Sequence, residues 1–576
     1  MKIQIICLKI VLFCFLICIS TTTFHCEAGV KAVVYANNLS NMNENSFQRI
    51  LNAKGVVYIL TQQTVGMPVS VKTRERYKKL KEDGKKVILD IWWGPNGEYN
   101  WNKYDFPDIA QNPQSRSEFF KKVIDPTINE IGKKNLYGVE MLEETGGWYG
   151  YKKTVWPNME FPTVNTPNIR KYNWLLQKET GLNMDMSPIW NMDENFACWR
   201  WINRTLSPAA AQKVFYDYIH KKYHGLKVFQ FEGLPDVATR CYGEYQVMLN
   251  SFDGIITDAY DSPREIYSAL ISYRTMAPKT EIVALVNGYF GTYGTKEDVY
   301  KIKKKRLKYA LSAGMNGIGF FEPDGKKVKV SDFQDPAVWR DNLKLFKIIV
   351  DKSVNVKKRK MLLVPLNYSV GGYGLAWYFG SVKLTGYAMI PASEFRMVNP
   401  ADYRAIVILG GYYPGVNTTW NQDYMQKKYH VDALFDANKL NRFVENGGLL
   451  VITGLPMNTG AELALVQKKL LTGSSLSTVK KLTLNNWSIQ NLKMKPAYSN
   501  GFSRNVYQYK TGPSVISLGE NCGYIVKYGK GYFLVLPQQP TGGSSKEAKS
   551  YAAFLTDVLR GFFNYAGARE LAEYFN

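Results

Sequence analysis

The chain has 576 residues, which is more than one domain usually contains, so two or three domains are expected. Hydrophobic residues make up 45% of the sequence and aromatic residues 14%, which provides for large cores and excludes intrinsic disorder. The formal net charge is +24, but the densest basic runs, 301–308 and 356–360, lack interleaved aromatic residues, so we predict no nucleic-acid partner.

Residues 1–28 have the features of a signal peptide. Lys2 supplies a positive charge, the stretch from Ile5 to Ile19 is apolar, and Cys26-Glu27-Ala28 fits a small-x-small cleavage site. We therefore predict a secreted, periplasmic or cell-surface protein, with an uncleaved N-terminal anchor as the alternative. No later segment is apolar enough to span a bilayer, so we expect no integral membrane segment after signal removal.

Metal and cofactor sites have little support in the sequence. Only Cys198, Cys241 and Cys522 remain after signal removal, which allows at most one disulfide. Histidine is scarce, and no cluster of Cys and His has the spacing of metal ligands. The chain also lacks a P-loop, a GxSxG elbow and an HExxH helix. We predict neither a metal nor a cofactor.

Residues 29–355 alternate between short apolar runs and helix-like segments. Eight runs have the length and composition of buried strands: 31–38, 55–63, 85–93, 136–144, 226–233, 254–262, 281–290 and 317–325. Amphipathic stretches such as 117–132 and 264–273 lie between them. Eight β-α units predict a (β/α)8 TIM barrel, with an open doubly wound sheet as the alternative. The connection 146–226 holds six tryptophans and is typical of an insertion over the C-terminal face of a barrel.

Residues 356–576 are predicted to form a second domain. Buried-strand runs at 361–369, 403–413 and 447–454 alternate with helical stretches, which predicts a flavodoxin-like α/β domain. The basic run before it is interpreted as a linker, and the run at 301–308 as the solvated face of a helix. The high net charge predicts non-specific attraction to an acidic glycan or an anionic cell surface.

The last part of this second domain is strand-rich. A hairpin is predicted at 522–537, with its turn at Gly529-Lys530-Gly531. A helix at 546–567 follows the hairpin and closes the domain.

Polar residues stand at the C-terminal ends of the predicted barrel strands. Side chains of a strand alternate between the barrel interior and the helices, so one parity of each strand is placed inward. This places Val228 and Gln230 inward on the fifth strand, and Ile318 and Phe320 inward on the eighth. The polar residues of the inward parity are Asp90 on the third strand, Glu140 and Glu144 on the fourth, Glu232 on the fifth, Asp258 on the sixth, Asn287 on the seventh and Glu322 on the eighth.

These acidic residues and the nearby tryptophans suit glycoside hydrolysis. Buried carboxylates are costly unless paired or solvated, so a group of them predicts a polar pocket. One carboxylic acid protonates the leaving oxygen, another attacks the anomeric carbon or activates water, and aromatic side chains stack on sugar rings. We predict a carbohydrate substrate, whose sugar and linkage stay open, with Asp90, Trp92, Trp93, Trp148 and Asn287 as binding residues.

The stretch EETGG at 143–147 is similar to the Asn-Glu-Tyr-Gly-Gly motif of glycoside hydrolase family 42, the β-galactosidases of clan A. DGIITDAYDS at 253–262 and SAGMNGIGFF at 312–321 resemble patterns in the sixth and last units of that family. The resemblance implies that Glu144 is the general acid/base. Glu140, deeper on the same strand, is then its electrostatic neighbour, which favours the protonated acid.

The second domain resembles the trimerisation domain of that family, a relative of class I glutamine amidotransferases. LPMN at 455–458 stands where amidotransferases have their catalytic Cys, so we expect no glutamine hydrolysis. The resemblance implies an interaction or oligomerisation role for this domain, which is expected to pack against the barrel or against another subunit of a homo-oligomer.

Two departures from the family pattern bear on the mechanism. Glu143 stands where the family has Asn, and Asn287 stands where clan A enzymes have their nucleophilic Glu. Either Glu322, Asp258 or Glu232, in that order, serves as the second carboxylate, or the protein is an inactive relative that binds glycan or has a structural role at a cell surface. A carboxyl separation of about 5–5.5 Å would indicate retention of configuration, and about 6.5–9.5 Å inversion.

Overall fold

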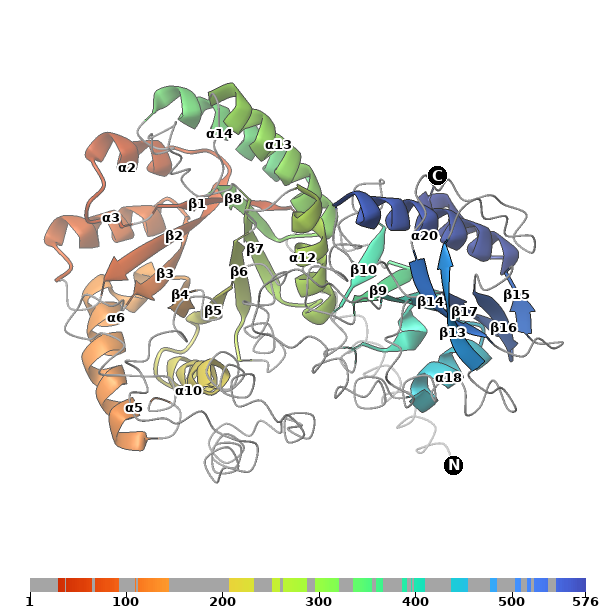
Figure 1. Ribbon diagram of the computed structural model, residues 1–576. Coiled ribbons are helices and arrows are strands. Elements are labelled where there is room, and N and C mark those ends of the chain that lie inside the picture. Colours follow the sequence, from red (N-terminus) through yellow and green to blue (C-terminus); the bar gives the residue numbers. More distant parts are fainter. Residues whose placement is uncertain are drawn as a thin grey trace, which may run out of the picture.

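The computed structural model of the protein describes a barrel followed by a second unit built on a mixed sheet (Figure 1). The described residues are 29–36, 38–64, 68–92, 109, 112–143, 207–232, 251–258, 263–286, 296–320, 335–354, 359–365, 386–390, 395, 398–409, 437–453, 477–483, 503–508, 515–518, 523–536 and 545–575. The predicted signal segment, 1–28, lies outside these ranges.

Eight parallel strands pair in sequence order, and the last pairs with the first, so the barrel is closed. The strands are β1 (Lys31–Tyr35), β2 (Val56–Thr64), β3 (Lys86–Trp92), β4 (Gly138–Glu143), β5 (Lys227–Glu232), β6 (Gly254–Asp258), β7 (Glu281–Leu285) and β8 (Gly317–Phe320). Each overlaps one of the eight predicted apolar runs. The predicted (β/α)8 barrel is confirmed, and the open doubly wound alternative is wrong.

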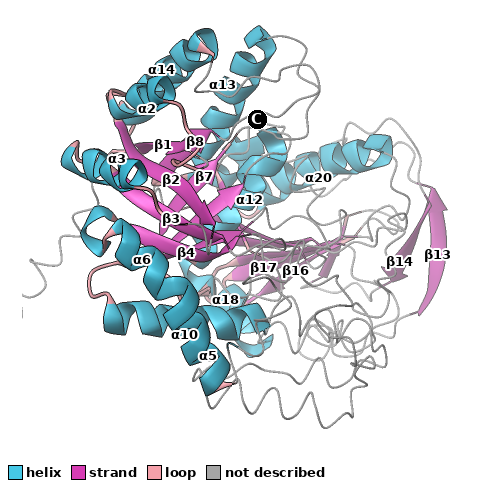
Figure 2. Ribbon diagram, turned by 90° about the vertical axis from the view of Figure 1, so that its left-hand side faces the viewer, coloured by secondary structure: helices cyan, strands magenta, loops and turns pink. Residues whose placement is uncertain are grey.

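Helices cover the outside of the barrel strands (Figure 2). Those of the described residues are α2 (Glu44–Leu51), α3 (Val71–Glu82), α5 (Pro113–Phe119), α6 (Asp125–Ile131), α10 (Ser207–Lys222), α12 (Pro263–Met276), α13 (Lys296–Ala313) and α14 (Pro336–Val350). Local sequence fixes several starts: the Ser70 side chain accepts the Thr73 N–H at α3, and Asp335 caps α14 ahead of Pro336. A π-helix, Phe120–Ile124, joins α5 to α6, so the predicted helical stretch 117–132 is confirmed.

The barrel has two apolar layers: an outer layer between the strands and the helices, and an inner layer in the interior that the strands enclose. The inner layer consists of Val33, Tyr35, Tyr58, Leu60, Ile88, Phe229, Phe231, Ile256, Val283 and Leu285. Their order confirms the predicted inward parity for the third, sixth and seventh strands. For the fifth strand the prediction is wrong, because Phe229 and Phe231 face inward and Val228 packs in the outer layer.

The room left by glycines on neighbouring strands explains this inward position of Phe229. A Cβ atom on Gly138 of β4 would lie 2.6 Å from the Phe229 ring, and one on Gly254 of β6 only 2.2 Å from it. The large ring therefore occupies the space that two missing side chains leave inside the barrel.

The predicted parity of the eighth strand is also wrong. A Cβ atom on Gly317 would lie 3.0 Å from Val33 and 3.1 Å from Val283, both inside the barrel. Ile318 and Phe320 belong to the outer layer, where the Phe320 ring packs against Phe346 of α14 with the ring centres 5.5 Å apart. Glycines, not the apolar side chains of β8, therefore face the interior.

The second unit is an α/β domain around a seven-stranded sheet of order β10-β9-β11-β12-β17-β16-β15. Its strands are β9 (Met361–Pro365), β10 (Tyr387–Met389), β11 (Ala405–Leu409), β12 (Leu449–Thr453), β15 (Val515–Ser517), β16 (Tyr524–Tyr528) and β17 (Gly531–Leu536). The pairs from β10 to β17 are parallel, and β16 and β15 continue the sheet antiparallel. The predicted parallel α/β core with a strand-rich end is confirmed.

The described part of this domain further contains the helices α18 (Ala437–Glu445), α20 (Ser545–Tyr565) and α21 (Arg569–Ala572), two short 3-10 helices (Pro400–Asp402 and Glu573–Phe575), and the strand pair β13 (Ser477–Thr483) and β14 (Ser503–Gln508). The predicted hairpin is formed by β16 and β17, and its turn holds Gly529 at φ +56°, a conformation that favours glycine. The segment 455–458, where an amidotransferase would have its Cys, lies outside the described residues.

The α/β domain packs directly on helix α12 of the barrel. The Tyr387 hydroxyl of β10 and Ser268 Oγ are hydrogen-bonded at 2.9 Å, and the Tyr267 hydroxyl donates to the Tyr387 carbonyl at 3.0 Å. Arg359 reaches back to donate to the Ser312 carbonyl at 2.6 Å. Since Tyr267 and Tyr387 are fully buried, this junction has the character of a core.

Candidate active site

The N-terminal end of the barrel interior is occupied by a polar cluster around Glu281. Its carboxylate accepts hydrogen bonds from the Tyr58 hydroxyl, from the Tyr137 hydroxyl at 2.9 Å and from Lys227 Nζ at 2.8 Å. Lys86 lies over the Tyr137 ring at 4.8 Å. A site inside the barrel is therefore reached from the C-terminal end, where barrel enzymes have their active sites.

The interactions within this cluster shift the pKa values of its members. Burial raises the pKa of Tyr58, and the negative charge and hydrogen bond of Glu281 raise it further. Burial alone would lower the pKa of Lys227, but hydrogen bonds with Glu281 and Tyr137 outweigh it and raise the pKa. Tyr58 thus stays neutral and Lys227 stays charged at neutral pH, which is the behaviour of a structural cluster.

A row of polar side chains crosses three neighbouring strands above the apolar inner layer. Gln62 of β2 is the register partner of Asp90 on β3, and Asp90 is the partner of Glu140 on β4. Gln62 Nε2 donates to Asp90 Oδ2 at 3.1 Å. Asp90 is 5% exposed and Glu140 is fully buried. The structure therefore brings two of the predicted site residues side by side.

The end of β4 departs from regular alternation. Glu140 pairs with Phe229 of β5, but the next pair is Glu143 with Phe231, so β4 has one residue more than β5 in this interval. The prediction that Glu144 faces inward assumed unbroken alternation from Glu140. The backbone register instead aligns Glu143 with a residue that faces the interior. Glu144 itself lies outside the described residues.

The structure describes the other predicted site residues only in part. Asp258 ends β6 two residues after the inward-facing Ile256, and its register partner is the inward-facing Leu285. Trp92 is the last residue of β3. Glu232 is the last residue of β5 and alternates with Phe229 and Phe231, so the prediction that it belongs to the inward set is wrong. The side chains of these three residues are not described. Asn287, Glu322, Trp93 and Trp148 lie outside the described residues, so their predicted roles stay predictions.

Gln62 was missed by the sequence analysis. It stands near the end of the predicted run 55–63, and two adjacent glutamines there are the signal that was available. Because side chains alternate along a strand, Gln63 faces the helices and not the barrel interior. Only Gln62 therefore belongs to the polar row.

Two further observations concern the described residues alone. No group of three or more His, Cys, Asp or Glu in them is placed to hold a metal ion. None of their helices is long and apolar enough to cross a membrane.

Comparison with solved structures finds this architecture among glycosidases. A β-galactosidase from Bacillus circulans sp. alkalophilus has a TM-score of 0.59 at 12% identity, covering 92% of this chain and 89% of its own. For a β-galactosidase from Halorubrum lacusprofundi the TM-score is 0.55 at 11% identity, with coverage of 92% and 89%. For an exo-β-1,4-mannosidase from Opitutaceae bacterium strain TAV5 it is 0.54 at 10% identity, with coverage of 94% and 96%.

The likeness is one of fold and extends over both parts of the chain. A GH42 β-galactosidase from G. stearothermophilus is among the similar structures, with a TM-score of 0.54 at 10% identity. The resemblance in fold to family 42 that the sequence predicted is thus confirmed. No protein-family model matches the sequence. No curated protein matches it either.

Proposed function

We propose that the protein is a glycoside hydrolase with its active site at the C-terminal end of the barrel. The observation that carries the proposal is the adjacency of Asp90 and Glu140 on paired positions of β3 and β4. Neighbouring strands lie about 4.8 Å apart, so these two buried acidic residues occupy adjacent positions on the inner face of the barrel. In general, burial and a neighbouring like charge both favour the protonated form of a carboxylic acid. Such a pair is suited to a site that must supply a proton.

Glu144 is proposed as the general acid, since the Glu-Thr-Gly-Gly context of the strand end is similar to the family motif. The bulge in β4 makes Glu143 the competing candidate, because its backbone is in register with the inward-facing Phe231. For the second carboxylate we now place Asp258 first. Its strand keeps the predicted inward parity, whereas the parity that supported Glu232 and Glu322 is wrong.

The proposed substrate is a carbohydrate with a terminal β-galactosyl or β-mannosyl unit, because the similar structures include β-galactosidases and an exo-β-1,4-mannosidase. Asp90 is proposed to bind a sugar hydroxyl, held in orientation by the hydrogen bond from Gln62. We also propose that the protein is secreted through its N-terminal segment, and that the α/β domain mediates assembly with further copies.

The test compares wild type with Glu144→Gln and Glu143→Gln on 4-nitrophenyl and methyl glycosides of galactose and mannose. Loss of a general acid lowers kcat/KM by about 10²–10⁴-fold on a poor leaving group, and by much less on 4-nitrophenol, which leaves without protonation. Glu118→Gln, on the exposed side of α5, is the matched control. A large loss in Glu143→Gln alone would transfer the role to Glu143.

A second candidate function is glycan binding without cleavage. Asn287 favours it, because clan A enzymes carry a carboxylate nucleophile at that position. Calorimetric titration of wild type with galactan and mannan oligosaccharides separates the two. Heat of binding with no reducing sugar released over days would establish the binding protein and exclude the hydrolase.

A further inference from the structure

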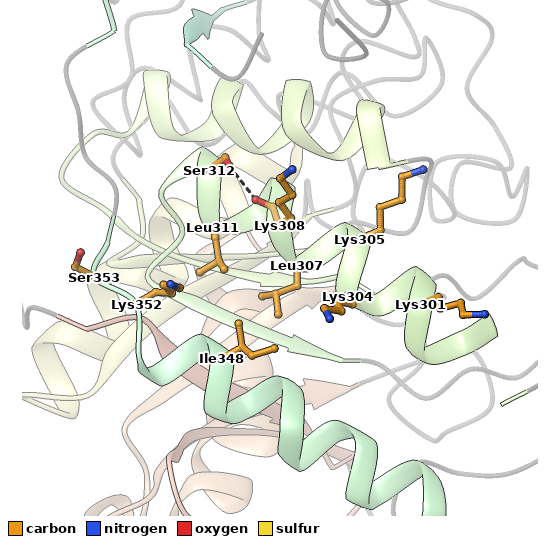
Figure 3. Close-up of a pocket in the computed structure, with 10 residues that line it drawn as sticks. All are labelled: Lys301, Lys304, Lys305, Leu307, Lys308, Leu311, Ser312, Ile348, Lys352 and Ser353. Carbon is orange, nitrogen blue, oxygen red and sulfur yellow. Dashed lines mark hydrogen bonds between the residues drawn. The ribbon is translucent and has the colours of Figure 1, made fainter. Parts of the chain in front are cut away.

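A groove with a basic rim lies on the outside of the barrel between α13 and α14 (Figure 3). Its volume is about 640 Å³, and its lining residues are Lys301, Lys304, Lys305, Leu307, Lys308, Leu311, Ser312, Ile348, Lys352 and Ser353. The end formed by Lys352 and Ser353 lies beside the start of β1, because Val30 N–H donates to the Lys352 carbonyl at 2.8 Å. The groove therefore extends toward the N-terminal end of the barrel, away from the candidate active site.

Four lysines of α13 follow one face of the helix. Lys301, Lys304, Lys305 and Lys308 have the spacing i, i+3, i+4 and i+7, so they cover about 10 Å along the helix axis. Lys301 is paired with Glu297 at 2.9 Å. Within the part of the chain that the structure describes, Lys304, Lys305, Lys308 and Lys352 have no ion-pair partner, and all four are exposed.

The floor of the groove is aliphatic. Leu307 and Leu311 of α13 and Ile348 of α14 converge between the two helices, with Lys304 and Lys352 near them, whereas Lys305 and Lys308 extend from the outer side of α13 (Figure 3). Leu307 is buried and the other two are partly buried. No aromatic side chain belongs to the lining, so a neutral sugar would find no ring to stack on. Recognition in this groove must therefore depend on charge.

The shape of the groove is fixed by a buried contact behind it. Lys303 is 2% exposed, and its Nζ donates to Asn342 Oδ1 of α14 at 3.0 Å. The same ammonium group lies 5.0 Å from the centre of the Phe320 ring. These contacts hold α13 and α14 at a constant separation, so the rim lysines stand on a rigid support and a ligand need not order the helices.

We propose that this groove binds a linear anionic polysaccharide that carries carboxylate or sulfate groups. Successive charges of such a chain can engage several rim lysines at once, and lysine, as a point charge, accepts either anion without a fixed orientation. A flat anionic bilayer fits less well, because the aliphatic residues lie at the floor of a concavity and not on a protruding surface. Nucleic acid fits less well too, because no aromatic residue is available for base stacking. The inference goes beyond the proposed hydrolysis and does not require it.

The experiment measures binding of the full chain to dextran sulfate, polygalacturonate and neutral dextran by fluorescence anisotropy at several salt concentrations, with phosphatidylglycerol vesicles and single-stranded DNA as further probes. The groove variant carries Lys304→Gln, Lys305→Gln and Lys308→Gln. The matched control carries Lys78→Gln, Lys79→Gln and Lys81→Gln, three exposed lysines of α3, and loses the same net charge. Circular dichroism checks that both variants are folded.

We expect the groove variant to lose affinity for at least one anionic polymer about tenfold, with its slope of log affinity against log salt reduced by about two. The α3 control should lose about twofold or less, through net charge alone. Equal losses in both variants would overturn the proposal in favour of non-specific attraction. Groove-dependent binding only to phosphatidylglycerol vesicles, or only to single-stranded DNA, would overturn it in favour of that other partner.

Because the readout is binding, the result stands whether or not the barrel cleaves a glycoside. A protein that hydrolyses methyl galactoside but binds neither anionic polymer through the groove would support the proposed function and refute this inference. A protein that binds dextran sulfate through the groove and cleaves nothing would do the opposite.

Discussion

At the N-terminal end of the barrel, a single carboxylate, Glu281, is surrounded by hydrogen-bond donors. At the C-terminal end, two carboxylates, Asp90 and Glu140, occupy paired positions on neighbouring strands. Both ends belong to one interior, and the apolar inner layer separates them. The first arrangement joins a carboxylate to a cation and two hydroxyl groups, and the second places two carboxyl groups on neighbouring strands.

The difference indicates what each end contributes. A carboxylate that accepts three hydrogen bonds, one of them from a cation, adds to stability. Two buried carboxyl groups on adjacent strands repel each other when ionised and cost stability. Arrangements of the second kind are typical of functional sites, where protonation is tuned at the expense of stability. Three predictions test whether the two ends differ in this way.

The largest effect is expected from Glu281→Gln. The amide cannot accept all three hydrogen bonds, and the buried Tyr58 hydroxyl loses its acceptor, so we expect a loss of about 3 kcal/mol in the free energy of unfolding. Lys227 contributes less to this loss because it is 38% exposed. Urea unfolding followed by fluorescence measures the change. The activity of the folded variant should match wild type.

Glu118→Gln is the control for this substitution. Glu118 pairs with Lys122 at 2.7 Å on an exposed helix face, and its loss should cost about 0.5 kcal/mol or less. If Glu281→Gln costs no more than Glu118→Gln, the cluster at the N-terminal end is not a stabilising feature.

Glu140→Gln is expected to have an intermediate effect, and to lower activity instead of stability. The substitution keeps the shape of a fully buried side chain and removes one of two like charges, so the free energy of unfolding should stay constant or rise. The activity should fall, with kcat/KM lower by about tenfold or more, because proton supply at the site changes. Hydrolysis of aryl glycosides and urea unfolding are measured on the same preparation. A destabilisation as large as that of Glu281→Gln would show that both ends are structural.

The sequence predicted the elements well because buried parallel strands leave a strong signal. Each barrel strand overlaps a run of apolar residues between amphipathic helices, and the hairpin of β16 and β17 is marked by Gly529-Lys530-Gly531. Asp90 and Glu140, two members of the predicted polar pocket, occupy paired positions because the third and fourth strands of a barrel are neighbours in space.

The sequence failed where a side-chain direction depends on a partner strand. Strand β5 is apolar on both faces, so hydrophobicity cannot choose between Val228 and Phe229. The choice is made by Gly138 and Gly254 on its neighbours, whose missing side chains leave space for the Phe229 ring. The bulge between Glu140 and Glu143 is likewise a property of the β4–β5 pair and not of β4 alone.

The smallest effect is expected from alkaline pH. The pKa of Tyr58 is raised in the folded protein, first by burial and then by the charge and hydrogen bond of Glu281. A raised folded pKa means that the stabilisation is fully present below the unfolded pKa, near 10, and is lost as the pH rises above it. At pH 10.5 the unfolded state gains about 0.8 kcal/mol from ionising this one tyrosine.

Tyr58→Phe removes that contribution and isolates it. The variant starts with a lower free energy of unfolding at pH 8, because Glu281 loses a donor. From pH 8 to pH 10.5, however, its free energy of unfolding should fall by about 0.8 kcal/mol less than that of wild type. Urea unfolding at both pH values gives the two differences. Parallel curves would mean that Tyr58 ionises as readily in the folded barrel as in the unfolded chain, and that the N-terminal end is open to water like a site and not closed like a core.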